Sequence, residues 1–149
     1  MPVTLVPVAR DDVRLARLMQ LYLHEWSAIF PDRVRIGADA LFTYPAASPL
    51  LRAVLFLDDA APFGFALTER DAQGTAHVEE FFVILGVRRR GLGSAAARAL
   101  FDGEQGPWTL TVRPENPGAL AFWRRVMRGA HERAEVGADG VPRVRLTQG

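Results

Sequence analysis

The residues whose types and spacing most clearly suggest ligand binding form one short segment, Arg88-Arg89-Arg90-Gly91-Leu92-Gly93. It precedes a run of small and apolar residues at helical spacing. Backbone N–H groups at a helix N-terminus carry partial positive charge, and glycine lets a ligand approach them closely. Arginine adds charge-assisted hydrogen bonds to phosphate. The segment therefore predicts a cradle for a diphosphate group.

By itself, the same segment also fits an ordinary tight turn with solvated arginines. It fits a dinucleotide-binding motif as well, because Gly91 to Ala96 matches G-x-G-x-x-A. That motif needs an acidic residue about 20 positions further on, at the end of the next strand. Here the next strand ends in Thr-Val-Arg-Pro, and too little chain follows for the rest of a dinucleotide fold.

The elements that would position the cradle follow from hydrophobic periodicity and turn residues. We expect a helix capped by Asp11 or Asp12, a loop with a short helix over residues 32–50, and a hairpin around Asp139-Gly140. The predicted strands are Val3–Val8, Leu51–Leu57, Phe63–Glu69, His77–Leu85, Trp108–Val112 and Val141–Leu146. The later helices run from the cradle to about residue 102 and from Asn116 to about Arg128. This order predicts one mixed α/β domain over residues 1–149.

Composition narrows the class of protein. The chain has 149 residues, 49% hydrophobic and 23% charged, which suits one globular domain. A net charge of +1, and arginines without interleaved aromatics, do not predict a nucleic-acid partner. The absence of cysteine excludes disulfides, cysteine nucleophiles and cysteine metal sites, and the three histidines lack metal-ligand spacing, so we predict no metal. Without a leader-like or membrane-spanning run, we expect no membrane contact and a cytoplasmic location.

The segment from Val83 to Leu100 resembles the acetyl-CoA signature of the GCN5-related N-acetyltransferase (GNAT) superfamily. The core Arg/Gln-x-x-Gly-x-Gly/Ala is met by Arg88, Gly91 and Gly93. The second signature, Asn-x-x-Ala-x-x-Phe-(Tyr/Trp), is met by Asn116, Ala119, Phe122 and Trp123. The resemblance covers residues 50–128 well and implies the GNAT fold, a mixed, mostly antiparallel sheet with helices on both faces. The N-terminal third fits only as the family's strand and two helices.

The resemblance also implies a site for acetyl-CoA as co-substrate. The backbone of Phe82 and Val83 would pair with the pantetheine arm like an added strand. Asn116 would contact the pantetheine or the nearby coenzyme, and Phe122 would line its path. A plain helix cap and core packing are the alternative roles of these two residues. The N–H groups that would hold the pyrophosphate belong to Arg88, Arg89, Arg90, Gly91, Leu92, Gly93 and Ser94.

For catalysis, the resemblance points to the adjacent pair Glu79 and Glu80. Neighbouring strand residues face opposite ways, so one carboxylate can face the cleft and take a proton from the amine. We favour Glu79 as the base and keep Glu80 as the alternative. If neither is catalytic, the two glutamates are a solvated or salt-bridged pair at the end of the sheet. Many family members have a tyrosine where this chain has Trp123, so the acid that protonates the thiolate is open between Tyr22, Tyr44 and water.

Together these features predict direct transfer of acetyl from acetyl-CoA to a primary amine of a small molecule. The Glu-Glu-Phe-Phe-Val segment resembles the polyamine-type and related small-amine members. The alternatives are a protein or peptide amine and a non-catalytic acyl-CoA-binding module. A homodimer is a further expectation from the family. The residues expected near the acceptor are Glu25, Trp26, Asp32 and Tyr44.

Overall fold

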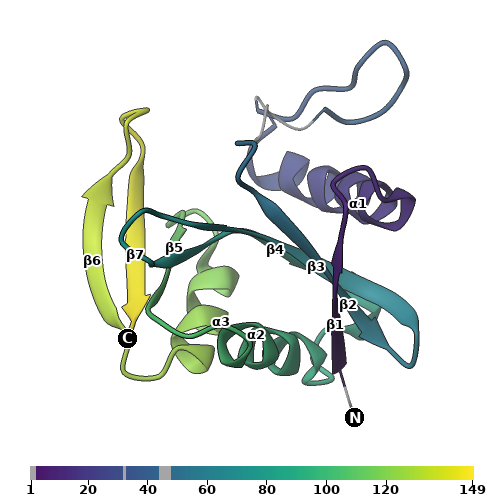
Figure 1. Cartoon of the computed structure of the whole chain (residues 1–149). Helices are drawn as coiled ribbons and strands as arrows, with labels where there is room; N and C mark the ends of the chain where they lie inside the picture. Colours follow the sequence, from purple (N-terminus) through teal and green to yellow (C-terminus); the bar gives the residue numbers. More distant parts are fainter. Residues whose placement is uncertain (1–2, 32, 44–47) are drawn as a thin grey trace.

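A computed structural model describes residues 3–31, 33–43 and 48–149, and these form one seven-stranded sheet covered by three helices (Figure 1). Its strands run in the order β1-β2-β3-β4-β5-β7-β6, and only β4 and β5 pair in parallel. The predicted mixed, mostly antiparallel sheet is therefore confirmed. The strands are β1 (Val3–Val8), β2 (Arg52–Asp58), β3 (Ala61–Arg70), β4 (Ala76–Val83), β5 (Trp108–Val112), β6 (His131–Val136) and β7 (Pro142–Gln148). The helices are α1 (Val13–Ile29), α2 (Leu92–Asp102) and α3 (Pro117–Val126).

Helix α1 covers one face of the sheet. Asp12 caps it by accepting a hydrogen bond from the Arg14 N–H, as the sequence predicts for this helix start. Hydrogen bonds from the Arg14 side chain and backbone lower the pKa of Asp12 to about 2. The helix ends at Ile29, two residues before Pro31. Its buried stripe, which packs on β2, β3 and β4, is Leu15, Leu18, Tyr22 and Leu23.

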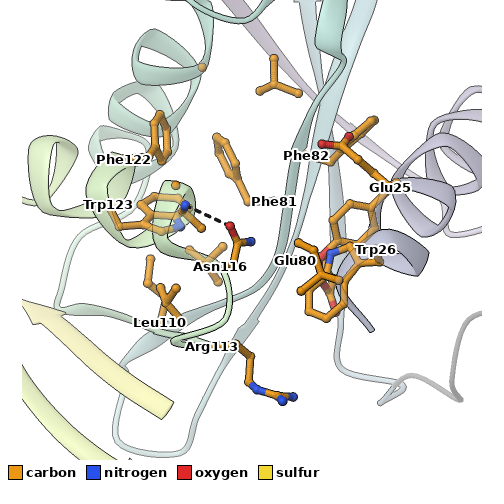
Figure 2. Close-up of a pocket in the computed structure, with 18 of the residues that line it drawn as sticks. Glu25, Trp26, Glu80, Phe81, Phe82, Leu110, Arg113, Asn116, Phe122 and Trp123 are labelled. Carbon is orange, nitrogen blue, oxygen red and sulfur yellow. Dashed lines mark hydrogen bonds between the residues drawn. The ribbon is translucent and has the colours of Figure 1, made fainter. Parts of the chain in front are cut away.

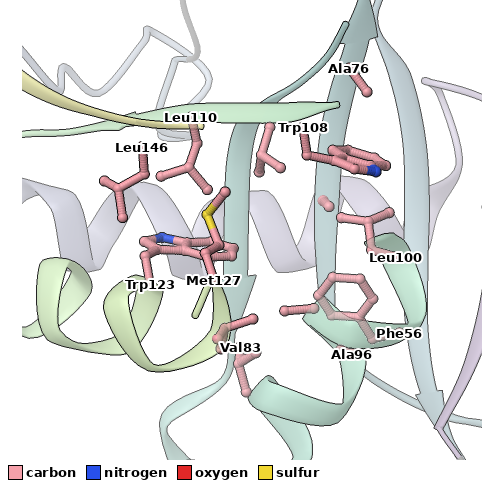
Figure 3. Close-up of a cluster of buried hydrophobic side chains, with 14 of the residues drawn as sticks. Phe56, Ala76, Val83, Ala96, Leu100, Trp108, Leu110, Trp123, Met127 and Leu146 are labelled. Atoms are coloured by element: carbon pink, nitrogen blue, oxygen red, sulfur yellow. The ribbon is translucent and has the colours of Figure 1, made fainter. Parts of the chain in front are cut away.

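Helices α2 and α3 cover the opposite face, so the predicted helices on both faces are also confirmed (Figure 1). Ala96 and Ala97 are fully buried, which lets α2 lie close to the sheet. The residues between these helices and the strands form one apolar cluster, shown in Figure 3. Its labelled members include Phe56, Trp108, Trp123, Met127 and Leu146.

Three details differ from the sequence prediction. The described parts of the loop after α1 contain no helix; an isolated bridge between Ile36 and Phe42 stands there instead. Strand β4 ends at Val83, because Leu85–Val87 turn into a short 3₁₀-helix that leaves Leu85 exposed. The hairpin also contains β6, whose charged and largely exposed residues carry little hydrophobic signal. None of the helices in the described part is long and apolar enough to cross a membrane.

The backbones of β3 and β4 approach each other closely at Gly64. A Cβ at this position would sit 2.2 Å from the Phe82 carbonyl oxygen and 2.9 Å from the Phe56 ring. We expect Gly64→Ala to lower the free energy of unfolding by about 1–3 kcal/mol, because backbone atoms of β4 cannot move aside cheaply. Urea unfolding measures this change.

Gly86→Ala is the matched control, because nothing lies within 4 Å of a Cβ at that glycine. Its unfolding free energy should stay within about 0.5 kcal/mol of the unchanged protein. Equal stabilities for the two variants would show that β3 and β4 do not approach as closely as the structure has them.

Candidate active site

The site begins where β4 and β5 part. Their parallel pairing covers only Ala76 to Val78 against Trp108 to Leu110, and the described residues show no pairing beyond it. A cavity of about 1050 Å³ opens between the diverging strands. Figure 2 shows Phe122 and Trp123 on one side of β4, and Glu25 and Trp26 on the other. Residues from α1, β4, the start of α2, β5 and α3 line this cavity.

The end of β4 offers backbone groups to this cavity. The Ile84 N–H donates to the Phe63 carbonyl on the β3 side. Because successive strand residues point their backbone groups to opposite sides, those of Phe81 and Val83 point toward the gap. Phe82, whose backbone contribution stays a prediction, also lines the cavity; its carbonyl approaches Gly64 of β3, and its ring packs 5.4 Å from that of Tyr22. Phe81 was not predicted, although the alternation from Val83 could have identified it.

The arginine–glycine segment forms an open helix start at the same cavity. Gly91 is the N-cap of α2 in the left-handed conformation, with φ 78°, and no side chain caps the helix. Nothing lies within 4 Å of a Cβ at Gly91, and Gly93 meets Val83 and Phe122 only at ordinary contact distance. A helix start of this kind attracts an anion. Of the predicted cradle residues, those that line the cavity are Arg88, Arg89, Gly91, Gly93 and Ser94.

The side chain of Arg88 is turned away from an anion at this cradle. Its Nη1 and Nη2 atoms donate to the Glu25 carboxylate at 2.5 and 2.7 Å, and its Nε donates to the Val83 carbonyl at 2.8 Å. The guanidinium also lies 5.7 Å from the centre of the Phe82 ring. Arg88 therefore joins α1 to the end of β4. Glu25, predicted near the acceptor, lines the cavity but already pairs with this arginine.

A β-bulge separates the two glutamates. Leu67 pairs with Glu80 and Thr68 pairs with Val78, so Glu79 is the extra residue of β4. The bulge turns Glu80 to the α1 face, where its half-buried carboxylate accepts a hydrogen bond from the Tyr22 hydroxyl. Glu79 is exposed, and its side chain has no hydrogen-bond or ion-pair partner in the described part of the chain. Both glutamates line the cavity.

Helix α3 brings the second predicted motif to the cavity. The Asn116 side chain caps this helix by accepting from the Ala119 N–H at 3.2 Å, marked by the dashed line in Figure 2. Its amide NH₂ is not used in that bond. The Phe122 and Trp123 rings pack 5.7 and 4.9 Å from the Phe81 ring. Trp123 is only 6% exposed, so its ring belongs mainly to the core.

The remaining predicted residues divide between the cavity and the undescribed positions. Trp26 lines the cavity and packs 4.8 Å from the Phe30 ring. Tyr44 and Asp32 lie outside the described residues. His77 pairs with Asp71 at 2.9 Å, and its hydrogen bond lowers the pKa of Asp71. Among residues 3–31, 33–43 and 48–149, no group of three or more His, Asp or Glu side chains could hold a metal ion.

The fold is similar to those of several solved acetyltransferases. An acetyltransferase from Thermus thermophilus superposes with a TM-score of 0.68 at 20% identity, covering 99% of this chain and 97% of that one. The ribosomal-protein-S18-alanine N-acetyltransferase from Escherichia coli gives 0.63 at 16% identity over 99% and 93%. Nourseothricin acetyltransferase gives 0.59 at 17% over 98% and 97%. Identities this low show the shared fold and leave the substrate open.

Sequence comparison adds the family. No curated protein matches the chain significantly. The model of the acetyltransferase (GNAT) family matches residues 15–127, which include the end of β4, the α2 cradle and all of α3. That match covers well over half of the chain, and it agrees with both motifs and with the strand order. The chain therefore belongs to the acetyltransferase (GNAT) family.

Proposed function

We propose that this protein transfers an acetyl group from acetyl-CoA to a primary amine of a small molecule. The observation that carries the proposal is that an uncapped helix start, gap-facing strand backbone and the Glu80 carboxylate open on one cavity. Family membership supports acyl-CoA as the donor. The pyrophosphate would lie on the N–H groups that open α2, and the pantetheine arm would lie along Phe81 and Val83.

The transfer itself needs one bond formed and one broken. The amine nitrogen attacks the thioester carbonyl carbon, the C–N bond forms, and the C–S bond breaks. Glu80 is our choice for the group that takes the amine proton, because its carboxylate is half-buried and faces α1. The Tyr22 hydroxyl donates to that carboxylate. In the proposed relay, Tyr22 would pass its proton to the departing thiolate and recover one from Glu80, which has taken it from the amine. With no cysteine in the chain, a cysteine-linked acetyl-enzyme is excluded.

A peptide amine is the second candidate acceptor. The similar Escherichia coli structure is named for an alanine of ribosomal protein S18, and its fold covers nearly all of this chain. An acetylation assay with peptides beside small amines separates the two candidates. A homodimer and a cytoplasmic location stay predictions from the sequence.

The first test concerns the cradle. We expect Gly91→Glu to weaken acetyl-CoA binding at least about 100-fold, or about 2.7 kcal/mol, because a carboxylate there fills the open space and repels the pyrophosphate. Calorimetric titration with acetyl-CoA measures this change.

Gly129→Glu is the matched control, since Gly129 also has positive φ and open surroundings but does not line the cavity. It should bind acetyl-CoA like the unchanged protein. If the unchanged protein does not bind acetyl-CoA, the proposed function is wrong.

The second test separates the two glutamates. We expect Glu80→Gln to lower kcat about 10²- to 10⁴-fold, because an amide cannot accept the amine proton but still accepts the Tyr22 hydrogen bond. Glu79→Gln should lower kcat less than about tenfold. Initial rates of thiol release at saturating acetyl-CoA measure both.

Acetyl-CoA affinity should be unchanged in both variants, which controls for folding. Loss of kcat in Glu79→Gln alone would transfer the role of base to Glu79. Undiminished turnover in both variants would show that neither glutamate takes part in the chemistry. If the unchanged protein turns over no amine, a non-catalytic acyl-CoA-binding module is favoured instead.

A further inference from the structure

Three arginines from distant parts of the chain line the cavity together. Arg33 follows α1, Arg113 follows β5, and Arg143 belongs to β7. Their ion-pair partners are two carboxylates, Asp139 and Glu115, which do not line the cavity. Asp139 accepts from both terminal nitrogens of Arg143 at 2.9 Å and lies 3.5 Å from Arg33, and Glu115 lies 2.5 Å from Arg113. This cluster, the arginine cluster, therefore holds one positive charge in excess.

Arg113 is held in place but uses few of its donors. Its guanidinium lies 4.3 Å from the centre of the Phe30 ring, and its side chain is 14% exposed. Only Nη2 donates within the described residues, to Glu115, and the buried Nε has no partner there. Figure 2 shows this side chain extending from the end of β5, away from Leu110 and Trp123. A fixed guanidinium with unused donors is suited to bind a planar anion.

The two carboxylates of the cluster balance two of its three positive charges at ordinary pH and leave one in excess. The hydrogen bond from Arg113 lowers the pKa of Glu115, and the charge of Arg33 acts in the same direction. The hydrogen bonds from Arg143 lower the pKa of Asp139. Both groups stay ionised and are engaged by their arginines. Glu25, which also lines the cavity, is engaged in the same way by Arg88.

We propose that the acceptor amine also carries a carboxylate, as a free amino acid does, and that Arg113 binds this carboxylate with help from Arg33. The inference rests on the proposed function and narrows its substrate. Glu80 would take the amine proton while the arginine cluster holds the anionic end. The second cation of a polyamine would meet guanidinium groups at this place, so the cluster argues against the polyamine-type acceptor that the Glu-Glu-Phe-Phe-Val segment suggested.

The test compares amines that differ only in the carboxylate. Tyrosine with tyramine, histidine with histamine, and lysine with cadaverine form suitable pairs. In any pair of which at least one member is acetylated, we expect kcat/KM for thiol release to be at least about tenfold higher for the amino acid. Equal or better use of the decarboxylated amines would overturn the inference.

Arg113→Gln shows whether the preference comes from the arginine cluster. The ratio within a pair should fall at least about tenfold, while acetyl-CoA affinity stays unchanged. The two amines of a pair differ in basicity, but this difference affects the unchanged protein and the variant equally. Comparing the kcat/KM ratio between the two proteins therefore removes it. Arg33→Gln should lower the ratio less, and it serves if Arg113→Gln does not fold, because the Arg33 side chain is 48% exposed.

Arg124→Gln is the control for charge, since Arg124 pairs with Glu132 and does not line the cavity. It should keep the full ratio. Acetyl-CoA binding without turnover of either member of any pair would overturn the inference and leave the cofactor site standing. Absence of acetyl-CoA binding would remove the proposed function and the inference together.

Discussion

The early end of the β4–β5 pairing is the constraint on which the rest of the structure depends. Three residue pairs join the strands, and beyond Val78 the backbone of β4 turns polar groups toward the gap. Such groups need partners once they are buried. The Val83 carbonyl receives one from Arg88, and side chains such as Phe81 fill only part of the gap. An extended ligand with its own amides would complete the pairing that β5 leaves open.

The bulge at Glu79 determines what faces that ligand. Val78 and Phe81 both belong to the cluster beneath α2 and α3, although three positions separate them. An unbroken strand would place Glu80 on the side of Val78, among the aromatic rings of α3. The extra residue turns Glu80 to Tyr22 instead. One inserted position thus puts a carboxylate on the α1 face and leaves the apolar packing of the other face intact.

The features that could be predicted are those with a local sequence signal. Asp12, Gly91 and Asn116 occupy the caps their types favour, and the strand limits agree within a few residues. The unpredicted features depend on tertiary contacts. A bulge has no required residue type, so alternation alone could not choose between the glutamates. The pair between Glu25 and Arg88 joins residues 63 positions apart, and Arg33 and Asp139 of the arginine cluster are 106 positions apart.

Arg88 shows that the positive charge before α2 need not all serve an anion, because its side chain pairs with Glu25. Glu25 and Arg88 are 36% and 35% exposed, so their pair adds little stability, typically about 0–1 kcal/mol for partly exposed pairs. The main effect of the pair is to hold the end of β4 and α1 in position. One guanidinium holds the Val83 carbonyl and Glu25, and Glu25 lies one helical turn from Tyr22. The end of β4 and the helix that carries Tyr22 are therefore joined through the same side chain.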